Sequence, residues 1–341
     1  MNQIIFSVIF LILLVGCASN YKDQRSRSIH FKNGEFKNPV SSSISLWDFL
    51  KMRAWAEYSD WPEYKEKPYK KINSARVDGE IINITHINHS TLLIQTQGIN
   101  IITDPIYSYR CSPVQWAGPS RVVNPGVRFE DLPKIDVVII SHDHYDHLDL
   151  DTIERLVERD NPKIYLGLGA GRHLSSMNNV TELDWWEFSQ VNEKLKVNFV
   201  PVQHFSGRGL FDRNSTLWGG YVLEFPAKKI YFGGDSGYAS HYQDTYQKFG
   251  SIDVALIPIG GYDPRTFMKY AHVNPEEAVK AHLDLKSKKS IGMHYGTFQL
   301  TAEKINDPVD ELNIAKEKYN ILPADFIAAE FGQTVVIGEG L

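Results

Sequence analysis

Four apolar runs in this 341-residue chain each end in a histidine or an aspartate, and this pattern restricts the fold more than any other feature of the sequence. The run at 137–140 leads into residues 142–147, which contain three histidines and two aspartates. The other three runs end beside His204, Asp235 and His294. In open α/β sheets, ligands bind beyond the carboxyl ends of the strands. We therefore expect an α/β fold in which several strand ends meet at one polar site.

Short β-rich segments dominate the sequence from Gly79 onward. They are bounded by turn signals and lie at 81–84, 91–95, 99–103, 137–140, 164–166, 197–200, 221–225, 230–232 and 254–257. Helices are predicted at 150–159, 275–283 and 310–319. Pro275 suits a first helical turn, with Asn274 as its N-cap. Many strands mixed with fewer helices predict one α/β layered domain over residues 79–341.

The short segment after the first run carries the most specific chemistry in the sequence. Single histidines are often packed in a core, but a cluster this dense directly after a buried strand is difficult to explain structurally. A compact loop can direct His142 and His144 to one ion, and Asp146 and His147 to a neighbouring ion. The donor atoms are nitrogen and oxygen, which suits zinc best and allows iron or manganese. A carboxylate such as that of Asp235 can bridge two ions roughly 3.5–4 Å apart.

The N-terminus is predicted to be a targeting segment. The apolar run at 4–15 is too short to span a bilayer, which needs roughly 20 residues, and is typical of a signal peptide. It ends in Leu14-Val15-Gly16-Cys17, which resembles a bacterial lipobox, although the leading residues carry no Lys or Arg. We expect residues 1–16 to be removed and Cys17 to be lipidated. The protein would then be anchored to a membrane of the cell envelope, with the outer membrane favoured. An ordinary secretory signal and a buried helix are the alternatives.

Residues 17–78 are predicted to form a tether and an N-terminal arm with one helix. The segment from 18 to about 45 is polar and rich in serine and asparagine, which is typical of an irregular tether. The helix is expected at 45–58. Its aromatic side chains could contact lipid, but packing on the main domain is the favoured interpretation.

Charge and cysteine content exclude one class of partner and one kind of cross-link. The formal net charge is −5, whereas nucleic-acid-binding proteins usually carry a basic face, so no nucleic-acid partner is expected. With Cys17 in the targeting segment, the only other cysteine, Cys111, has no intrachain partner. We expect Cys111 to be a small buried side chain rather than a reactive thiol, because no Lys or His lies beside it to lower its pKa.

The pattern His-x-His-x-Asp-His at 142–147 resembles the metallo-β-lactamase superfamily. The resemblance implies an αββα sandwich with the metals at the edges of the sheets. It also implies that Asp235 bridges two ions and that Asp104 hydrogen-bonds to a ligand. The remaining ligands implied by the resemblance are His142, His144 and His204 for one ion and Asp146, His147 and His294 for the other.

Longer motifs resemble a narrower family, the N-acylphosphatidylethanolamine-hydrolysing phospholipases D. The match covers about residues 80–335 and includes the segments 103–106, 112–115, 118–121, 141–148, 182–186, 257–279 and 294–298. Asp143 and Gly261 stand where we expect Asn and Ala in the animal enzymes, and neither difference removes a ligand. The resemblance implies hydrolysis of a phosphodiester bond in a phospholipid, which releases phosphatidic acid and an N-acylethanolamine.

The expected reaction assigns roles to particular residues. A hydroxide held between the two metals would attack phosphorus, because coordination lowers the pKa of water. Asp146 and Asp235 are the ligands to which we assign catalytic roles. His272 is a candidate for protonating the leaving alkoxide, with a core or ligand-supporting histidine as the alternative.

Further residues are assigned more loosely. The candidates for contacting the phospholipid are Arg265, Lys269 and Tyr262. For the first two, an ordinary solvated position is the alternative. His86 and His89 are interpreted as structural residues or as hydrogen-bond partners of the ligands.

Two other functions remain open at this stage. A lactonase, or a phosphodiesterase acting on soluble substrates, would use the same scaffold, and the fold does not choose between them. A non-catalytic surface lipoprotein with a structural metal is the second alternative, although such sites usually hold one four-coordinate ion. Acyl-chain preference and oligomeric state stay open.

Overall fold

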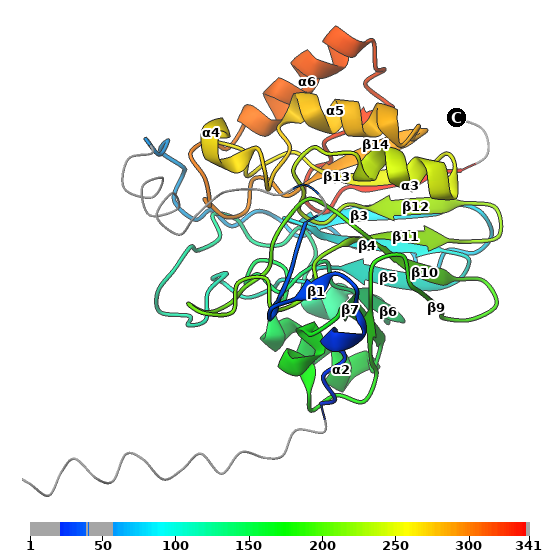
Figure 1. Cartoon of the computed structure of the whole chain (residues 1–341). Coiled ribbons are helices and arrows are strands. Elements are labelled where there is room, and N and C mark those ends of the chain that lie inside the picture. Colours follow the sequence, from blue (N-terminus) through cyan, green and yellow to red (C-terminus); the bar gives the residue numbers. More distant parts are fainter. Residues whose placement is uncertain (1–20, 39, 41–56, 339–341) are drawn as a thin grey trace, which may run out of the picture.

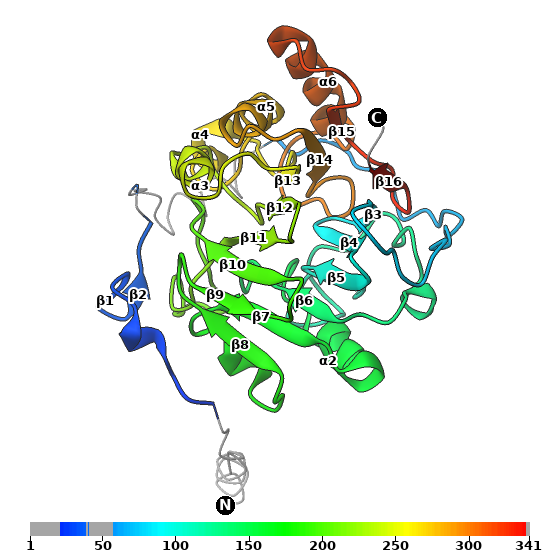
Figure 2. The ribbon, with the colours of Figure 1, turned by 90° about the vertical axis from the view of Figure 1, so that its right-hand side faces the viewer.

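The computed structural model describes residues 21–38, 40 and 57–338. Within these residues the strands form two seven-stranded sheets and one small two-stranded sheet. The two large sheets lie face to face, and helices cover their outer faces (Figures 1 and 2). This arrangement is the αββα sandwich that the sequence predicts.

The two large sheets share one plan. In each, an antiparallel half continues into a parallel half, with the change at β5 in the first sheet and at β12 in the second. The first sheet has the order β16 (Thr334–Ile337), β3 (Ile82–Asn88), β4 (Thr91–Thr96), β5 (Ile99–Thr103), β6 (Val137–Ile139), β7 (Lys163–Gly167) and β8 (Val180–Leu183). The second has the order β15 (Phe326–Ile327), β14 (Lys289–Met293), β13 (Val254–Pro258), β12 (Lys229–Phe232), β11 (Gly220–Glu224), β10 (Lys196–Val200) and β9 (Phe188–Gln190).

Alternating side chains fill the space on both faces of each sheet. In β5, Ile101 packs in the core between the sheets and Ile102 packs in the outer core of the first sheet. In β11, Tyr221 and Leu223 face the inner core, while Val222 faces the helices that cover the second sheet. Because side chains alternate along a strand, both faces of these strands must be apolar.

Helices cover the two outer faces. The first sheet is covered by α2 (Leu150–Asp160) and η3 (Ala170–Leu174), whereas the second is covered by α3 (His241–Phe249), α5 (Pro275–Asp284) and α6 (Asp307–Tyr319). The short helix α4 (Arg265–Met268) precedes α5. The start of α5 is a capping box in which Asn274 accepts a hydrogen bond from the Glu277 backbone, as the sequence predicts.

The predicted strands and helices of the main domain are all present, although some ends differ. The strand β3 continues to Asn88, four residues beyond its predicted end. The sequence did not predict the helices α3 and α4, the turn η3 or the short strands β8, β9, β15 and β16. It also did not predict the short turns η1 (Arg25–Arg27) and η2 (Phe129–Asp131) or the strands β1 (Phe31–Lys32) and β2 (Glu35–Phe36).

The N-terminal arm contacts the sandwich in its described part. Phe36 is fully buried with residues of both sheets, and its backbone N–H donates to the Asn214 carbonyl. The division at residue 79 stays a prediction. The leader at 1–16, Cys17 and nearly all of the predicted helix at 45–58 lie outside the described residues. Among the residues that are described, no helix has the length and apolar character needed to cross a membrane.

Candidate metal centre

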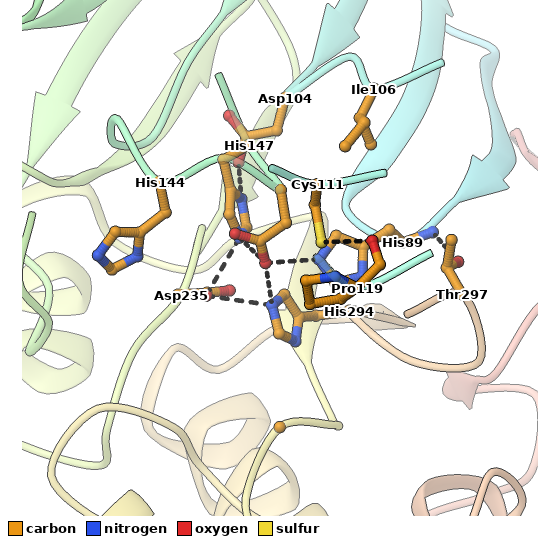
Figure 3. Close-up of polar contacts among 12 residues, drawn as sticks. His89, Asp104, Ile106, Cys111, Pro119, His144, His147, Asp235, His294 and Thr297 are labelled. Carbon is orange, nitrogen blue, oxygen red and sulfur yellow. Dashed lines mark hydrogen bonds and ion pairs between the residues drawn. The ribbon is translucent and has the colours of Figure 1, made fainter. Parts of the chain in front are cut away.

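The loops that follow five strands bring the predicted ligands to one edge of the sandwich. Figure 3 shows His144, His147, Asp235 and His294 among them, with Asp104 beside His147. Asp104 follows β5, and the segment 142–147 follows β6. His204, Asp235 and His294 follow β10, β12 and β14. Asp104 and His294 adopt positive φ angles of 34° and 61°, which turn the chain sharply at the strand ends.

Three histidines form what we call the first group: His142, His144 and His204. The Nδ1 atom of His144 lies 2.8 Å from His142 Nε2 and 3.4 Å from His204 Nε2. These nitrogen atoms converge closely enough for all three to contact one ion. The structure therefore brings together the three side chains that the sequence assigns to one metal.

The second group consists of Asp146, His147 and His294. The Asp146 Oδ2 atom lies 3.3 Å from His147 Nε2 and 3.4 Å from His294 Nε2. His89 joins this cluster, because its Nε2 atom is 3.0 Å from the same carboxylate oxygen (Figure 3). The second group thus contains its predicted members, and His89 contacts it through Asp146.

Asp235 lies between the two groups. Its Oδ2 atom is 3.1 Å from the Nε2 atoms of both His147 and His294 in the second group. The same oxygen is 3.8 Å from His204 Nε2 and 4.0 Å from His142 Nε2 in the first group. A carboxylate in this position can be shared by two ions, which is the role that the sequence resemblance assigns to it.

Hydrogen bonds from outside the groups fix the orientation of the imidazole rings. Asp104 Oδ2 lies 2.7 Å from His147 Nδ1, and the same side chain accepts bonds from the Ser141 backbone and hydroxyl. His204 Nδ1 lies 2.9 Å from the Ala271 carbonyl oxygen, so this nitrogen donates and leaves Nε2 facing the centre. These contacts present lone pairs toward the cluster, as partners of metal ligands do.

The two groups differ in charge. Burial lowers the pKa of His142 and His204 well below the ordinary value and also lowers that of His144, so the first group is neutral at physiological pH. Burial opposes protonation of the second group too. There, however, the carboxylates of Asp235 and Asp146 prevail, raising the pKa of His147 well above its ordinary value and that of His294 to about 9.

The unpaired atoms at the centre fit a bound cation. Both ring nitrogens of His294, the Nε2 atom of His147 and the Oδ1 atom of Asp235 are buried and have no hydrogen bond of good geometry, and the two Nε2 atoms have only ion pairs with Asp235 and Asp146. Buried polar atoms are rarely left without a partner. An ion among these atoms would replace the protons of the two histidines and bind the lone pairs thus freed, and the nitrogen and oxygen donor set suits zinc. The residues therefore fit the metal site that the sequence predicts.

His272 and Arg265 lie beside the centre in different ways. The Nε2 atom of His272 is 3.9 Å from Asp235 Oδ2, and burial lowers the pKa of this histidine to about 4. Arg265 does not face the ligands with its guanidinium. It donates to the His272 carbonyl at 2.7 Å and to Glu277 Oε2 at 2.7 Å, so it holds the segment that carries His272.

The other two predicted substrate contacts are not members of the ligand groups, although Tyr262 follows Gly261, which packs against the rings of His272 and His294. Lys269 is exposed, with its ammonium group 4.9 Å from the centre of the Tyr270 ring. Tyr262 is buried and lines a surface pocket with Glu303 and Glu311, and none of the predicted ligands lines that pocket. Their predicted contact with substrate stays a prediction.

Several residues at the centre were not identified from the sequence. The side chain of Asn38 in the N-terminal arm donates to the His204 carbonyl at 2.6 Å, and the ring of Phe205 lies 4.6 Å from that of His144. The only sequence feature that pointed to Phe205 is its position directly after the ligand His204. No sequence feature pointed to Asn38. Cys111 is free and buried, and burial strongly raises its pKa, which agrees with the prediction of an unreactive side chain.

Comparison with known proteins agrees with this geometry. A profile of the beta-lactamase superfamily domain matches residues 99–295, which contain all the predicted ligands. A metallo hydrolase from the archaeon Ignicoccus hospitalis has the same fold, with a TM-score of 0.58 at 22% sequence identity over 76% of this chain and 100% of its own. The fold and the clusters together define a metal-dependent hydrolase of the metallo-β-lactamase superfamily.

Two relatives narrow the assignment. The N-acyl-phosphatidylethanolamine-hydrolyzing phospholipase D 1 of Caenorhabditis elegans is 36% identical over 73% of this chain and 74% of its own length. An uncharacterized protein of Mycobacterium tuberculosis is 37% identical over 90% of this chain and 85% of its own. The chain belongs to the family of the N-acylphosphatidylethanolamine-hydrolysing phospholipases D.

Proposed function

We propose that the protein hydrolyses N-acylphosphatidylethanolamine, or a related glycerophospholipid, on the head-group side of phosphorus. The products would be phosphatidic acid and an N-acylethanolamine. The observation that carries the proposal is the position of Asp235 between two ligand groups, in a chain that shares 36% identity with a relative named for this reaction. Two zinc ions are the proposed cofactors, with iron or manganese as alternatives.

The residues of the centre are suited to a phosphodiester. Bound ions would supply Lewis acidity toward the phosphoryl oxygens and would lower the pKa of a coordinated water. Asp235 and Asp146 would hold the ions at a fixed separation. The proton that the leaving oxygen takes up would come from the water consumed in the reaction. His272, which is neutral at physiological pH, can orient the leaving oxygen through a hydrogen bond from Nε2, and Arg265 holds His272 in place through its carbonyl.

The location of the protein belongs to the same proposal. A lipid anchor at Cys17 would hold the enzyme at the envelope membrane, beside its phospholipid substrate. A Cys17→Ser variant should move from the membrane fraction to the soluble fraction, or remain unprocessed. If the variant fractionates with membranes in the same processed form, the anchor is refuted while the activity is untouched.

Product analysis tests the reaction. Metal-loaded protein is incubated with mixed phospholipid vesicles, and phosphatidic acid and free N-acylethanolamine are expected together. A His144→Ala variant should lose both products, because it lacks a ligand of the first group. His282→Gln is the matched control, since this buried histidine bonds to Ser290 in the second sheet. Protein that opens a lactone or cleaves a soluble diester, yet leaves every phospholipid intact, would refute the proposal.

A further inference from the structure

Two loops beside the metal centre carry unusually exposed apolar side chains. Among the described residues, the three most exposed large hydrophobic side chains are Trp116 at 82%, Leu210 at 86% and Phe211 at 99%. Trp116 belongs to the loop at 107–118, and the other two belong to the loop at 205–213. Scattered exposed hydrophobic residues are ordinary on protein surfaces, but the clustering of the most exposed ones beside one site is not.

The two loops stand on the side where the metal centre is open. In the segment 142–147, only His144, Tyr145 and Asp146 are partly exposed. The Tyr145 hydroxyl donates to the Arg208 carbonyl at 3.0 Å. Tyr145 and Arg208 also line one cleft of about 580 Å³ together with Ser108, Tyr109, Arg110, Ser112, Pro113 and Gln115 of the other loop. The loops therefore flank a common cleft next to the ligands.

Polar contacts at the base of the loop at 205–213 hold its tip outward. Asp212 Oδ1 accepts bonds from the backbone N–H groups of Arg208 and Gly209, at 3.2 and 2.8 Å. The Arg208 guanidinium donates to the carbonyl oxygens of Asp143 and Leu148, both at 2.8 Å. These hydrogen bonds fix the base of the loop, so Leu210 and Phe211 project from a well-defined position.

The loop at 107–118 is closed in a similar way. The Gln115 side chain accepts from the Arg110 backbone at 3.0 Å and donates to the Arg110 carbonyl at 3.1 Å. The Arg110 guanidinium donates to the carbonyl oxygens of Gln115 and Gly118. These bonds fix the turn from which Trp116 projects. Apolar side chains that the loop structure keeps exposed to water cost free energy unless a partner covers them.

The charge of the loops favours an anionic surface. They contain three arginines, Arg110, Arg208 and Arg213, against a single acidic residue, Asp212, whereas the whole chain has a formal net charge of −5. The Arg208 guanidinium turns inward to carbonyl oxygens, so Arg110 and Arg213 are the arginines left to meet lipid phosphates. Tryptophan and tyrosine are enriched at membrane interfaces, where basic side chains pair with lipid phosphates. Apolar tips with arginines behind them match the layered chemistry of a bilayer surface better than the face of a folded protein.

We propose that the loops at 107–118 and 205–213 dock on a phospholipid bilayer, with Trp116, Leu210 and Phe211 inserted among the acyl chains. Docking in this position would turn the opening at Tyr145 toward the membrane. The inference rests on the proposed function for its choice of partner. It is separate from the anchor predicted at Cys17, because a tether limits distance from the membrane whereas these loops set orientation.

Trp116 supplies a direct readout. The full chain is reconstituted in vesicles of phosphatidylethanolamine and phosphatidylglycerol that contain brominated lipids, which quench tryptophan within the bilayer. Subtracting the emission of a Trp116→Phe variant isolates the contribution of Trp116 from the other tryptophans. We expect that contribution to be shifted to the blue and quenched, and a Leu210→Ser/Phe211→Ser variant to lose most of both effects. Ile314→Ser/Leu322→Ser is the matched control, because it removes exposed apolar side chains around α6.

Activity provides a second readout. Each variant is assayed on vesicle phospholipid and on a soluble aryl phosphodiester, and the two rates are expressed as a ratio. The ratio should fall by about tenfold or more in Leu210→Ser/Phe211→Ser, because two large apolar side chains lose their bilayer contact. The ratio should be unchanged in the α6 control. An equal ratio in both variants would overturn the proposal.

The outcomes separate this inference from the proposed function. Phospholipid hydrolysis with no lipid effect on Trp116 would refute the docking surface and leave the function standing. Quenching of Trp116 without hydrolysis of any phospholipid would refute the proposed function and leave the docking surface standing. The Trp116 emission could instead be unchanged by vesicles and change when the protein is diluted. In that case a second copy of the chain covers the exposed apolar side chains of the two loops, and the bilayer proposal is wrong.

Discussion

The first and second groups of the metal centre face each other across Asp235, yet they differ in charge before any ion is bound. The first group holds three histidines that burial keeps neutral. In the second group, His147 and His294 are held protonated by neighbouring carboxylates. A metal binds the neutral imidazole, so the first group can accept an ion directly, whereas the second must release protons.

The charge difference predicts the order in which the two ions bind. In the metal-free protein, the second group is already compensated by its own ion pairs, with Asp235 3.1 Å from both His147 and His294. The first group has neutral rings and only distant contact with that carboxylate, 3.8 and 4.0 Å from His204 and His142. We therefore expect the first ion to enter the first group, and the second ion to replace protons.

Removing the shared carboxylate should have the largest effect. Asp235→Asn removes the charge that both ions would share, so it should weaken both and lower hydrolysis by at least about 100-fold. Metal content after dialysis, measured by elemental analysis, should fall in both groups. Asp253→Asn is the control, because this buried aspartate bonds to Lys229 and Lys288 away from the centre. Full retention of two ions by Asp235→Asn would show that it does not bridge.

Removing one ligand at a time tests metal binding by each group separately. His204→Ala should leave only the second group able to hold an ion, and His294→Ala only the first, so each should retain about one equivalent. Both variants should lose most of the phospholipase activity, because neither holds the pair of ions. Cobalt substitution gives a check, since the absorption bands of the two remaining sites should differ. Identical spectra would contradict two distinct groups.

The sequence predicted the parts of the centre that follow strands. His142, His204, Asp235 and His294 each follow an apolar run. The strands β12 and β14 belong to the parallel half of the second sheet, and β10, two antiparallel steps from β12, runs in the same direction, so the ends of these strands meet at one edge. The local pattern is sufficient here, because the direction of a buried strand fixes where its last residue lies. Local signals also predicted the start of α5, because Asn274 as cap and Pro275 in the first turn are adjacent in sequence.

What the sequence could not show depends on long-range contacts. The sequence indicated that His89 is a structural residue or a hydrogen-bond partner of the ligands, but it did not show that the partner is Asp146. That contact depends on a register shift in β3 between His86 and Asn88 and on a φ of 43° at His89, and neither feature has a clear local signal. Arg265 looked like a free cation but is paired with Glu277, twelve residues away. The strand β16 pairs with β3 from the far end of the chain.

The pH dependence of metal affinity should differ between the two groups. Below about 9, the pKa of His294, this histidine carries a proton that an entering ion must displace, so affinity in the second group should rise with pH up to that value. The rise should approach about tenfold per pH unit for each proton released. The first group is already neutral, so its affinity should be nearly flat over the same range. Calorimetric titration of zinc into metal-free His204→Ala and His294→Ala isolates the two cases. The same pH dependence of zinc affinity in both variants would contradict the predicted charge difference between the groups.

The smallest expected effect concerns His89, which contacts the second group alone. Burial lowers its pKa to about 3, so the ring is neutral and can orient Asp146 by a hydrogen bond without neutralising the carboxylate. His89→Ala should lower affinity in the second group by about 10-fold and leave the first group unchanged, because loss of such a partner usually costs 10- to 100-fold.

A conservative variant separates orientation from packing at this position. The His89 ring also lies 4.1 Å from the ring of His294, so His89→Ala removes packing as well as a hydrogen bond. His89→Gln keeps an N–H donor near Asp146 and should restore part of the lost affinity. Zinc titration and thermal unfolding are measured together, with His282→Gln as the buried control. Equal losses in both groups, or a loss that follows only the unfolding temperature, would mean that His89 merely supports the fold and that the two groups are not tuned separately.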